Sequence, residues 1–248
     1  MKLLIINPNI SESVTSLIEK EARLAAASGT EITMLTAPMG VAYIETRFEA
    51  MIAAYAVAEL AATHAARHDA VIVAAFGDPG LEGLREALDI PVLGMTESAL
   101  MSACMLGKRF SIIAISRRIT AWYRDMVERN GLIDRLASIR CLDEPLRDIG
   151  SVQDDHAARL QALCEAAVSE DGADVLIIAG APLAGLARSI KQSLPVPAVD
   201  GVSSAVNHAQ SLVSLAPAPA RAGSFAKPPR KDFKNLPPGL TQLLSQLP

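Results

Sequence analysis

The chain contains the same short pattern twice, and this repeat constrains its fold more than any other feature. The first copy is residues 69–81, Asp-Ala-Val-Ile-Val-Ala-Ala-Phe-Gly-Asp-Pro-Gly-Leu, and the second is residues 174–183, Asp-Val-Leu-Ile-Ile-Ala-Gly-Ala-Pro-Leu. Each copy begins with a β-branched apolar run that is too short for a helix, and each ends in glycine and proline. Each is followed by a helical pattern and by a second short strand that a proline introduces, at 91–94 and 197–200. We therefore predict one α/β unit that is used twice.

The order of elements also repeats between the two halves of the chain. The first half predicts a strand at 2–6, a helix that Ser11 or Ser13 caps and that runs to about residue 27, a strand at 31–35 and a long helix within 43–68. The second half predicts a strand at 109–115, a helix at 120–130, a strand at 136–142 and a helix at 153–170. A last helix is expected at about 201–215. This repeated order favours two parallel-sheet lobes that face each other.

These patterns suggest where the lobes begin and end. We expect residues 1–95, together with about 205–215, to form the first lobe and residues 96–204 to form the second. Residues 216–248 are rich in Pro, Ala, Lys and Arg and show no sustained periodicity before residue 240. This Pro-rich segment cannot bury much surface, so it is either an extended arm that wraps a surface or a neighbouring subunit, or a disordered tail.

Composition and charge limit the kind of partner. Half of the residues are hydrophobic but only 4% are aromatic, so Ala, Val, Ile and Leu must fill the core. The net charge of −4, with no basic run, argues against nucleic acid, and no apolar run reaches the ~20 residues that span a bilayer. Cys104, Cys141 and Cys164 lack the spacing of a disulfide framework or a zinc site. We expect a cytoplasmic protein that acts on a small molecule.

Ligands of parallel-sheet proteins bind beyond the carboxyl ends of the strands, where loops and helix N-termini present backbone N–H groups. In this chain the segments that follow strands at that edge are 7–9, 75–77, 115–116 and 180–182. If the lobes face each other, the turns at Ala75 and Gly180 approach one cleft from opposite sides.

Several of these segments together resemble the aspartate/glutamate/hydantoin racemase superfamily, and in particular its hydantoin and allantoin racemases. The matching segments are Asn7-Pro8-Asn9, Tyr43-Ile44-Glu45, 76–81, 91–97 and 180–187. They occur in the order that the family shows, and the similarity runs from about residue 1 to residue 210. The resemblance implies an α/β fold of two pseudo-symmetric flavodoxin-like lobes with parallel sheets and an inter-lobe active-site cleft. It also implies an isomerase that needs no cofactor and forms a homo-oligomer.

The chain departs from that family at the two residues that carry the chemistry. In the family, one cysteine thiolate removes the proton from the stereocentre, and a second thiol returns a proton on the opposite face. By resemblance these positions are Ala75 and Gly180, neither of which can carry a proton. Three explanations stay open: altered chemistry, an engineered replacement at position 75, or a binding protein without turnover. Gly180 favours natural divergence, because a glycine loosens the backbone and is a poor engineered replacement.

If the chain is catalytic, another titratable side chain near the cleft must transfer the proton. The candidates are Tyr43, Glu45 and Asp78, followed by Glu97, Asp200 and His208. Each has a structural alternative. Asp78, before Pro79-Gly80, and Asp200, before Gly201, stand where helix caps stand. Glu97 falls in the first turn of a helix, where the dipole stabilises a carboxylate, and His208 lies well inside the last helix.

The expected substrate-binding residues are Asn9, Tyr43, Glu45, Phe76, Gly77, Ile115, Ser116, Ala181 and Pro182. Backbone N–H groups at Phe76-Gly77 and Ala181 are expected to hold carboxylate or ring oxygens, as in an oxyanion hole. Side chains of Asn9 and Ser116 would add hydrogen bonds. His64 and His68 have the spacing of two metal ligands on one helix, but no third ligand is evident, so we expect no metal site.

The sequence therefore predicts a racemase or epimerase of a small carboxylate- or hydantoin-like amino-acid derivative that works without the two-thiol mechanism. One alternative is a lyase, hydrolase or decarboxylase that uses the same enolate-stabilising cleft. The other is a ligand-binding protein without catalysis. The sequence contains no dinucleotide-binding glycine motif, P-loop or serine hydrolase elbow.

Overall fold

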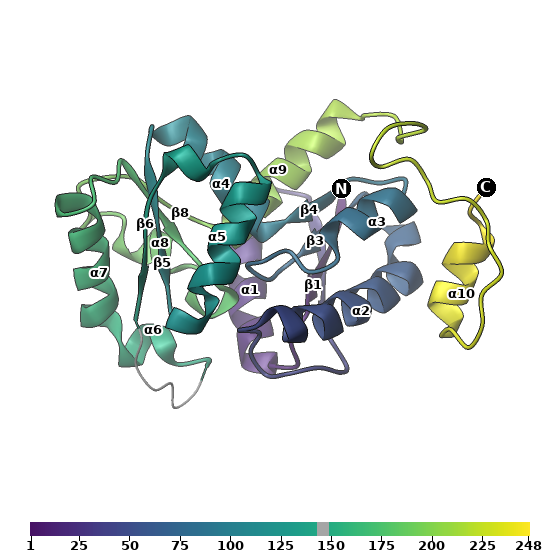
Figure 1. Ribbon diagram of the computed structural model, residues 1–248, viewed down its shortest axis with the longest axis horizontal. Coiled ribbons are helices and arrows are strands. Elements are labelled where there is room, and N and C mark those ends of the chain that lie inside the picture. Colours follow the sequence, from purple (N-terminus) through teal and green to yellow (C-terminus); the bar gives the residue numbers. More distant parts are fainter. Residues whose placement is uncertain (143–148) are drawn as a thin grey trace.

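The computed structural model describes residues 1–142 and 149–248 and contains two four-stranded parallel sheets (Figure 1). The strands of the first sheet are β1 (Lys2–Asn7), β2 (Glu31–Thr36), β3 (Ala70–Val73) and β4 (Val92–Gly94), in the order β2-β1-β3-β4. The strands of the second sheet are β5 (Phe110–Ala114), β6 (Leu136–Cys141), β7 (Val175–Ile178) and β8 (Ala198–Asp200), in the order β6-β5-β7-β8. The shared order confirms the predicted fold of two similar α/β lobes.

Helices connect the strands within each lobe. The first lobe has α1 (Glu12–Ala25), α2 (Arg47–His64), followed by a short 3₁₀ turn, and α3 (Leu81–Ala87). The second lobe has α5 (Thr120–Arg129), α6 (Val152–Asp155), α7 (Ala157–Ser169) and α8 (Leu186–Ile190). Between the lobes, α4 (Met95–Leu106) and α9 (Gly201–Leu215) pack against each other. The prediction of one continuous helix over 153–170 is wrong. The backbone at His156 leaves the helical conformation and separates α6 from α7.

Two helices begin where side chains satisfy the free N–H groups of the first turn. The hydroxyl of Ser11 accepts a hydrogen bond from the N–H of Val14, which confirms one of the two predicted caps of α1. At α2, Thr46 and Glu49 form a reciprocal capping box. The Glu49 carboxylate also accepts the N–H of Glu45 at 2.7 Å. The start of α2 therefore fixes the end of the loop that carries Tyr43.

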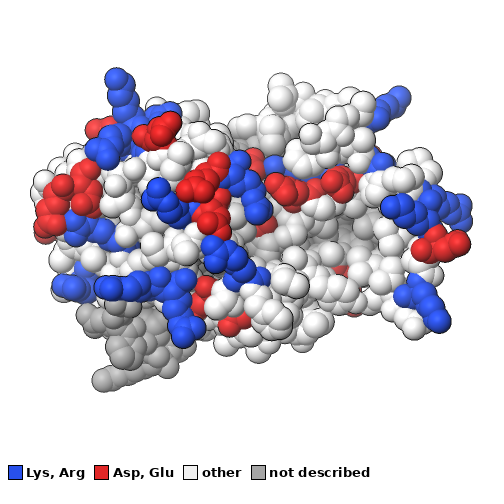
Figure 2. All heavy atoms as spheres, viewed as in Figure 1, with Lys and Arg blue, Asp and Glu red and all other residues white. Residues whose placement is uncertain are grey.

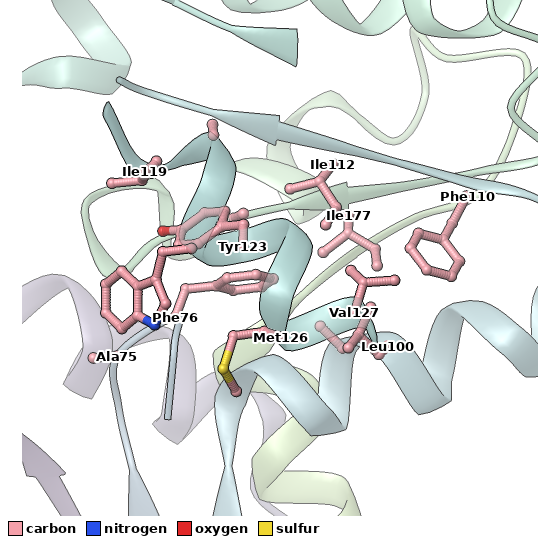
Figure 3. Packing of buried hydrophobic residues seen from close by; sticks show 14 of the residues in the cluster. Ala75, Phe76, Leu100, Phe110, Ile112, Ile119, Tyr123, Met126, Val127 and Ile177 are labelled. Atoms are coloured by element: carbon pink, nitrogen blue, oxygen red, sulfur yellow. The ribbon is translucent and has the colours of Figure 1, made fainter. Parts of the chain in front are cut away.

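Each lobe inserts its repeated turn into the hydrophobic core of the other lobe. Ala75 and Phe76, from the first lobe, belong to the buried cluster formed by β5, β7, α4 and α5. Ala181 and Ala184, from the second lobe, belong to the cluster formed by β1, β3, α1 and α9. Figure 3 shows the ring of Phe76 beside that of Tyr123 in the first of these clusters. Because apolar contacts cross the interface in both directions, the two turns are held facing each other.

Ion pairs also join the lobes. Arg47 on α2 donates from Nε to the carboxylate of Asp125 on α5 at 2.9 Å. Arg188 on α8 contacts Glu21 on α1 at 2.5 Å, and Glu21 is only 2% exposed. A buried carboxylate is stable only when it is paired, so the second bridge favours the closed arrangement of the lobes more strongly than the exposed first one.

The segment 216–248 lies along the first lobe, with α10 (Pro238–Ser245) against α2 (Figure 1). The approach of the two helices is close, because a Cβ on Gly239 would lie 2.3 Å from Oγ1 of Thr63. Lys227 pairs with Asp89 at 2.6 Å, and Leu247 is 7% exposed. In this structure the arm therefore covers the surface of its own first lobe.

The charged side chains form a mixed surface. Figure 2 shows basic and acidic groups intermixed across the face that it presents. Within residues 1–142 and 149–248, no helix combines the length and the apolar character that crossing a membrane requires. The same residues contain no group of three His, Cys, Asp or Glu side chains suited to a metal ion.

Candidate active site

The turns at Ala75 and Gly180 line one small cavity between the lobes. Five of the expected substrate-binding residues also line it: Asn9, Tyr43, Phe76, Ala181 and Pro182. The other two lining residues, Ile44 and Tyr123, were not expected. The cavity volume is ≈ 20 Å³, which is room for about one water molecule. The site is therefore formed but small, and both polar and apolar groups line it.

Tyr43 contributes a polar group that has no partner in the described protein. Its phenolic oxygen is buried and makes no hydrogen bond, although other atoms of the residue remain partly accessible. Burial raises the pKa of Tyr43 well above its usual value, with a further contribution from the nearby Glu45 carboxylate. The hydroxyl therefore stays protonated and is a hydrogen-bond donor at neutral pH. A buried donor without an acceptor is destabilising by about 1–3 kcal/mol, so this hydroxyl is available to hydrogen-bond a ligand in the cavity.

An aromatic cluster of Phe76 and two residues of α5 lies beside the cavity. The ring centroids of Phe76 and Tyr123 are 4.5 Å apart, and those of Trp122 and Tyr123 are 6.0 Å apart. Trp122 lies directly on Gly77, where a Cβ would be 2.0 Å from the indole ring. Gly77 has φ +114, a conformation that favours glycine. Its missing side chain is therefore what allows the indole of the second lobe to cover the turn of the first lobe.

The backbone donors at the two turns differ in availability. The N–H of Gly77 donates to Oγ1 of Thr96 at 2.5 Å, so the expectation that it holds a ligand oxygen is wrong for this conformation. Within the described residues, the N–H groups of Phe76 and Ala181 donate to no protein acceptor. Each turn thus retains a backbone donor without a protein acceptor among the described residues. Such preorganised donors can stabilise the negative charge of an enolate.

Asp78 caps a different helix from the one that the sequence suggested. Helix α3 begins at Gly80 with no side-chain cap, whereas the Asp78 carboxylate accepts the N–H groups of Thr96 and Glu97 at 2.8 and 2.9 Å. It therefore caps α4 from the site turn. Burial raises the pKa of Asp78 to about 7, although the two N–H groups favour the charged form.

This shift predicts a pH dependence that Asp78→Asn removes. Between about pH 4 and pH 7 the folded state holds a proton on Asp78 that the unfolded chain has lost, so the free energy of unfolding falls as the pH rises through this range and levels off above it. A shift of about three units corresponds to at most about 4 kcal/mol. Urea denaturation of both proteins at pH 4 to 8 measures the difference. A difference that stays constant would show that Asp78 is ionised throughout.

Several other expected residues lie outside the cavity. Ile115 is fully buried among second-lobe residues, and the hydroxyl of Ser116 accepts the N–H of Arg118 as a local cap. Glu45 lies in the same loop as Tyr43 but does not line the cavity. The interpretation of Glu97 as a residue of the first helical turn is confirmed, and its carboxylate pairs with Arg85 at 2.9 Å.

The remaining titratable candidates have structural roles. The carboxylate of Asp200 accepts the N–H of Ser203 and caps α9, as its position predicts. His208 lies within α9 and contacts the hydroxyl of Ser102 at 3.4 Å. His68 is not on the helix of His64: α2 ends at His64, and the His68 ring contacts the carbonyl of His64 and the hydroxyl of Thr33.

Sequence reasoning missed the residues of α5. Tyr123 lines the cavity and Trp122 covers Gly77, yet both lie on a helix that no strand-end argument selects. The signal that was available is scarcity, because the chain has one Trp and three Tyr and places two of them side by side. In a core filled by aliphatic residues, an adjacent Trp-Tyr pair is a reason to examine that helix for a role at the site.

Comparison with known proteins agrees with this architecture. The sequence profile of the Asp/Glu/Hydantoin racemase family matches residues 3–209. A hydantoin racemase of Paenarthrobacter aurescens is 34% identical over 241 residues, which cover 94% of this chain and 100% of that protein. An allantoin racemase structure from Klebsiella pneumoniae has a TM-score of 0.90 at 33% identity and covers 95% of this chain and 96% of its own. An allantoin racemase structure from Pseudomonas fluorescens has a TM-score of 0.88 at 34% identity and covers 95% of this chain and 100% of its own. Sequence and structure together establish that this chain belongs to the Asp/Glu/hydantoin racemase family.

Proposed function

We propose that the protein is a racemase of small hydantoin-like amino-acid derivatives and that it uses the cavity between Ala75 and Gly180 without a pair of thiols. The family and its hydantoin and allantoin racemase relatives support the substrate class. The observation that carries the assignment is the convergence of both turns and the unpartnered Tyr43 hydroxyl on one small cavity.

The donors around the cavity suit this chemistry. The hydrogen on the stereocentre of a hydantoin is acidic because the resulting carbanion is delocalised onto the adjacent ring carbonyl as an enolate. The hydroxyl of Tyr43 and the N–H groups of Phe76 and Ala181 are free to bind ring oxygens. Hydrogen bonds that strengthen as charge develops on the oxygen lower the barrier to proton removal.

Substrate entry requires a change in the site. A five-membered ring is larger than a cavity of ≈ 20 Å³. We infer that the loop between β2 and α2, which carries Tyr43, moves away to admit the ring and closes over it. Its end is fixed by the capping box at Thr46 and Glu49, so the movement is confined to the residues before Glu45.

The test is hydrogen–deuterium exchange at the stereocentre in heavy water, followed by proton NMR, with circular dichroism to follow inversion. Single enantiomers of 5-substituted hydantoins and of allantoin are the substrates, and we expect both signals above the protein-free rate. Ligand-dependent thermal stabilisation measures binding separately. Thermal stabilisation without hydrogen exchange would identify a binding protein. A new product in the mass spectrum would identify a lyase, hydrolase or decarboxylase. The absence of all these signals would contradict the substrate class.

Tyr43→Phe tests the role of the unpartnered hydroxyl. We expect the variant to be as stable as the wild type or more stable by about 1 kcal/mol, because it removes a buried donor without an acceptor. We expect substrate binding to weaken about tenfold, as the loss of one hydrogen bond implies. Isothermal titration and thermal unfolding measure the two effects. Tyr55→Phe, on α2 and 40% exposed, is the matched control; equal affinity of the two variants would contradict the assignment.

We also propose that the protein works in the cytoplasm as a homo-oligomer. Two neighbouring apolar side chains on α2 support self-association: Phe48 and Met51 are 70% and 69% exposed and lie on one face of the helix. Analytical ultracentrifugation of the full chain measures the assembly, and a monomer at micromolar concentration would contradict it.

A further inference from the structure

We propose that the hydroxyl of Tyr123 replaces the proton-carrying side chain that position 180 lacks, so that the protein transfers protons on one face of the bound ring only. The inference rests on the proposed function, since it assigns a step of that reaction to a residue of the same cavity. It goes beyond that function because it predicts that hydrogen exchange at the stereocentre is faster than inversion of the stereocentre.

The geometry at Gly180 carries the assignment. A Cβ built on Gly180 would lie 3.7 Å from the hydroxyl oxygen of Tyr123 and 3.7 Å from Cδ of Pro182. Apart from the two chain neighbours of Gly180, no other atom of the described residues comes within 4 Å. A reactive side chain at position 180 would therefore extend into the space beside this hydroxyl. Tyr43 does not come within 4 Å of that Cβ position. Of the two phenols at the cavity, only Tyr123 is in place to substitute for a side chain at this turn.

The packing of Tyr123 holds the hydroxyl in position. The residue is 2% exposed, and its ring is fixed between the aromatic rings of Phe76 and Trp122. Figure 3 shows the ring of Tyr123 beside that of Phe76, with the phenolic oxygen at the side of the cluster that faces away from Val127 and Leu100. A proton carrier must be held in a fixed orientation to work on one atom of a substrate, and this ring satisfies that requirement.

The turn at Ala75 supplies no proton carrier of its own. Ala75 presents only a methyl group, and among the described residues the titratable side chains that line the cavity are Tyr43 and Tyr123 alone. Tyr43 stays protonated and is assigned above to a ring oxygen, so in this proposal proton transfer on the Ala75 face depends on water. The two faces of the substrate ring are unequal in this site.

The proposed step is balanced without a further reactant. The phenolate of Tyr123 takes the hydrogen from the stereocentre: the C–H bond breaks, an O–H bond forms, and the electron pair moves onto the ring carbonyl as an enolate. The phenol then exchanges its proton with solvent and returns a hydrogen to the same carbon on the same face. Inversion occurs only when water on the Ala75 face supplies the proton instead.

The surroundings of Tyr123 determine how the reaction depends on pH. Burial raises its pKa well above the usual value, and Tyr43, Cys141, Asp78 and Glu45 raise it further when they are charged. Phenolate is therefore scarce at pH 7. Its fraction grows tenfold for each pH unit below the pKa, so the rate of exchange should rise in the same proportion.

The experiment compares exchange with inversion for each enantiomer of a 5-substituted hydantoin in heavy water. In the wild type we expect one enantiomer to exchange its hydrogen at least tenfold faster than it inverts. Tyr123→Phe should lower that exchange at least tenfold while ligand-dependent thermal stabilisation persists. Tyr55 lies on the surface, so Tyr55→Phe should change neither the rate of exchange nor the thermal stabilisation by the ligand. Wild-type exchange that Tyr123→Phe leaves intact, or inversion as fast as exchange, would overturn the inference and leave the proposed function standing.

A second measurement avoids any dependence on the folding of Tyr123→Phe. The chain has three tyrosines, and replacing all of them with 3-fluorotyrosine lowers the phenol pKa without removing a hydroxyl. We expect the pH profile of exchange to shift to lower pH in the fluorinated protein. An unshifted profile would overturn the role of a phenol. If the wild type neither exchanges hydrogen nor binds the hydantoin, the proposed function itself fails.

Discussion

Replacing Ala75 by cysteine is expected to raise the rate of racemisation of a hydantoin-like substrate by about 10²-fold or more. A positioned acid or base contributes about 10²–10⁴-fold to a proton transfer, and the methyl group of Ala75 supplies none. The side chain at position 75 is 7% exposed and lines the cavity, so an added sulfur atom reaches the space that the substrate ring would adjoin. Circular dichroism of a single enantiomer over time measures the gain. Activity should increase with pH, because an apolar site raises the pKa of a thiol.

Matched variants separate the thiol from the shape of the side chain. Ala75→Ser adds an atom of similar reach but a hydroxyl of much lower acidity, and we expect it to remain close to the wild-type rate. Adding Gly180→Cys to Ala75→Cys would supply a thiol on both faces, but Gly180 has φ +100, and a side chain there costs about 1–3 kcal/mol of stability. A folded double variant without activity would show that the cavity has been remodelled beyond the two missing thiols.

Replacing Gly77 by alanine is expected to lower the free energy of unfolding by about 3 kcal/mol or more. The added Cβ would lie 2.0 to 2.7 Å from three atoms of the Trp122 indole, and a rigid ring wedged between lobes cannot move aside cheaply. Overpacking of this kind costs about 1–3 kcal/mol. The backbone at φ +114 adds about 1–2 kcal/mol for any residue with a Cβ. Urea denaturation at fixed pH measures the loss.

Gly83→Ala is the control for this variant. Gly83 lies in α3, and a Cβ there meets no atom within 4 Å. Alanine is the better helix former, so we expect this change to be neutral or to stabilise the protein by about 0.5–1 kcal/mol. Equal stability of the two variants would mean that Trp122 does not rest on Gly77 in solution.

The chain by itself predicted the elements that depend on local physics. A short β-branched run between breakers can only be a buried strand, and Ser11 or Asp200 before a helical pattern can satisfy the N–H groups of its first turn. The duplication followed from the two copies of the repeat. These signals lie within a few residues of one another, which is why they can be read without the fold.

Tertiary structure decided which groups of the site are free. Asp78 was predicted to cap a helix, but the helix that it caps begins 17 positions further along the chain, at Met95. The hydroxyl of Thr96, on the same helix, accepts the hydrogen bond of the Gly77 N–H. Ser116 satisfies its own turn instead of a ligand. A hydrogen-bond acceptor can be recognised in a sequence, but the donor that reaches it is chosen by packing.

The aromatic residues that α5 places around the cavity were also beyond the sequence. Tyr123 and Trp122 reach the first lobe only because Ala75 and Phe76 of that lobe pack into the hydrophobic core of the second lobe. What the sequence alone determined is that two glycine- and proline-rich turns end two equivalent strands and carry no thiol. That a phenol from α5 lies beside one of those turns follows from contacts between residues about 50 positions apart or more, which local patterns do not encode.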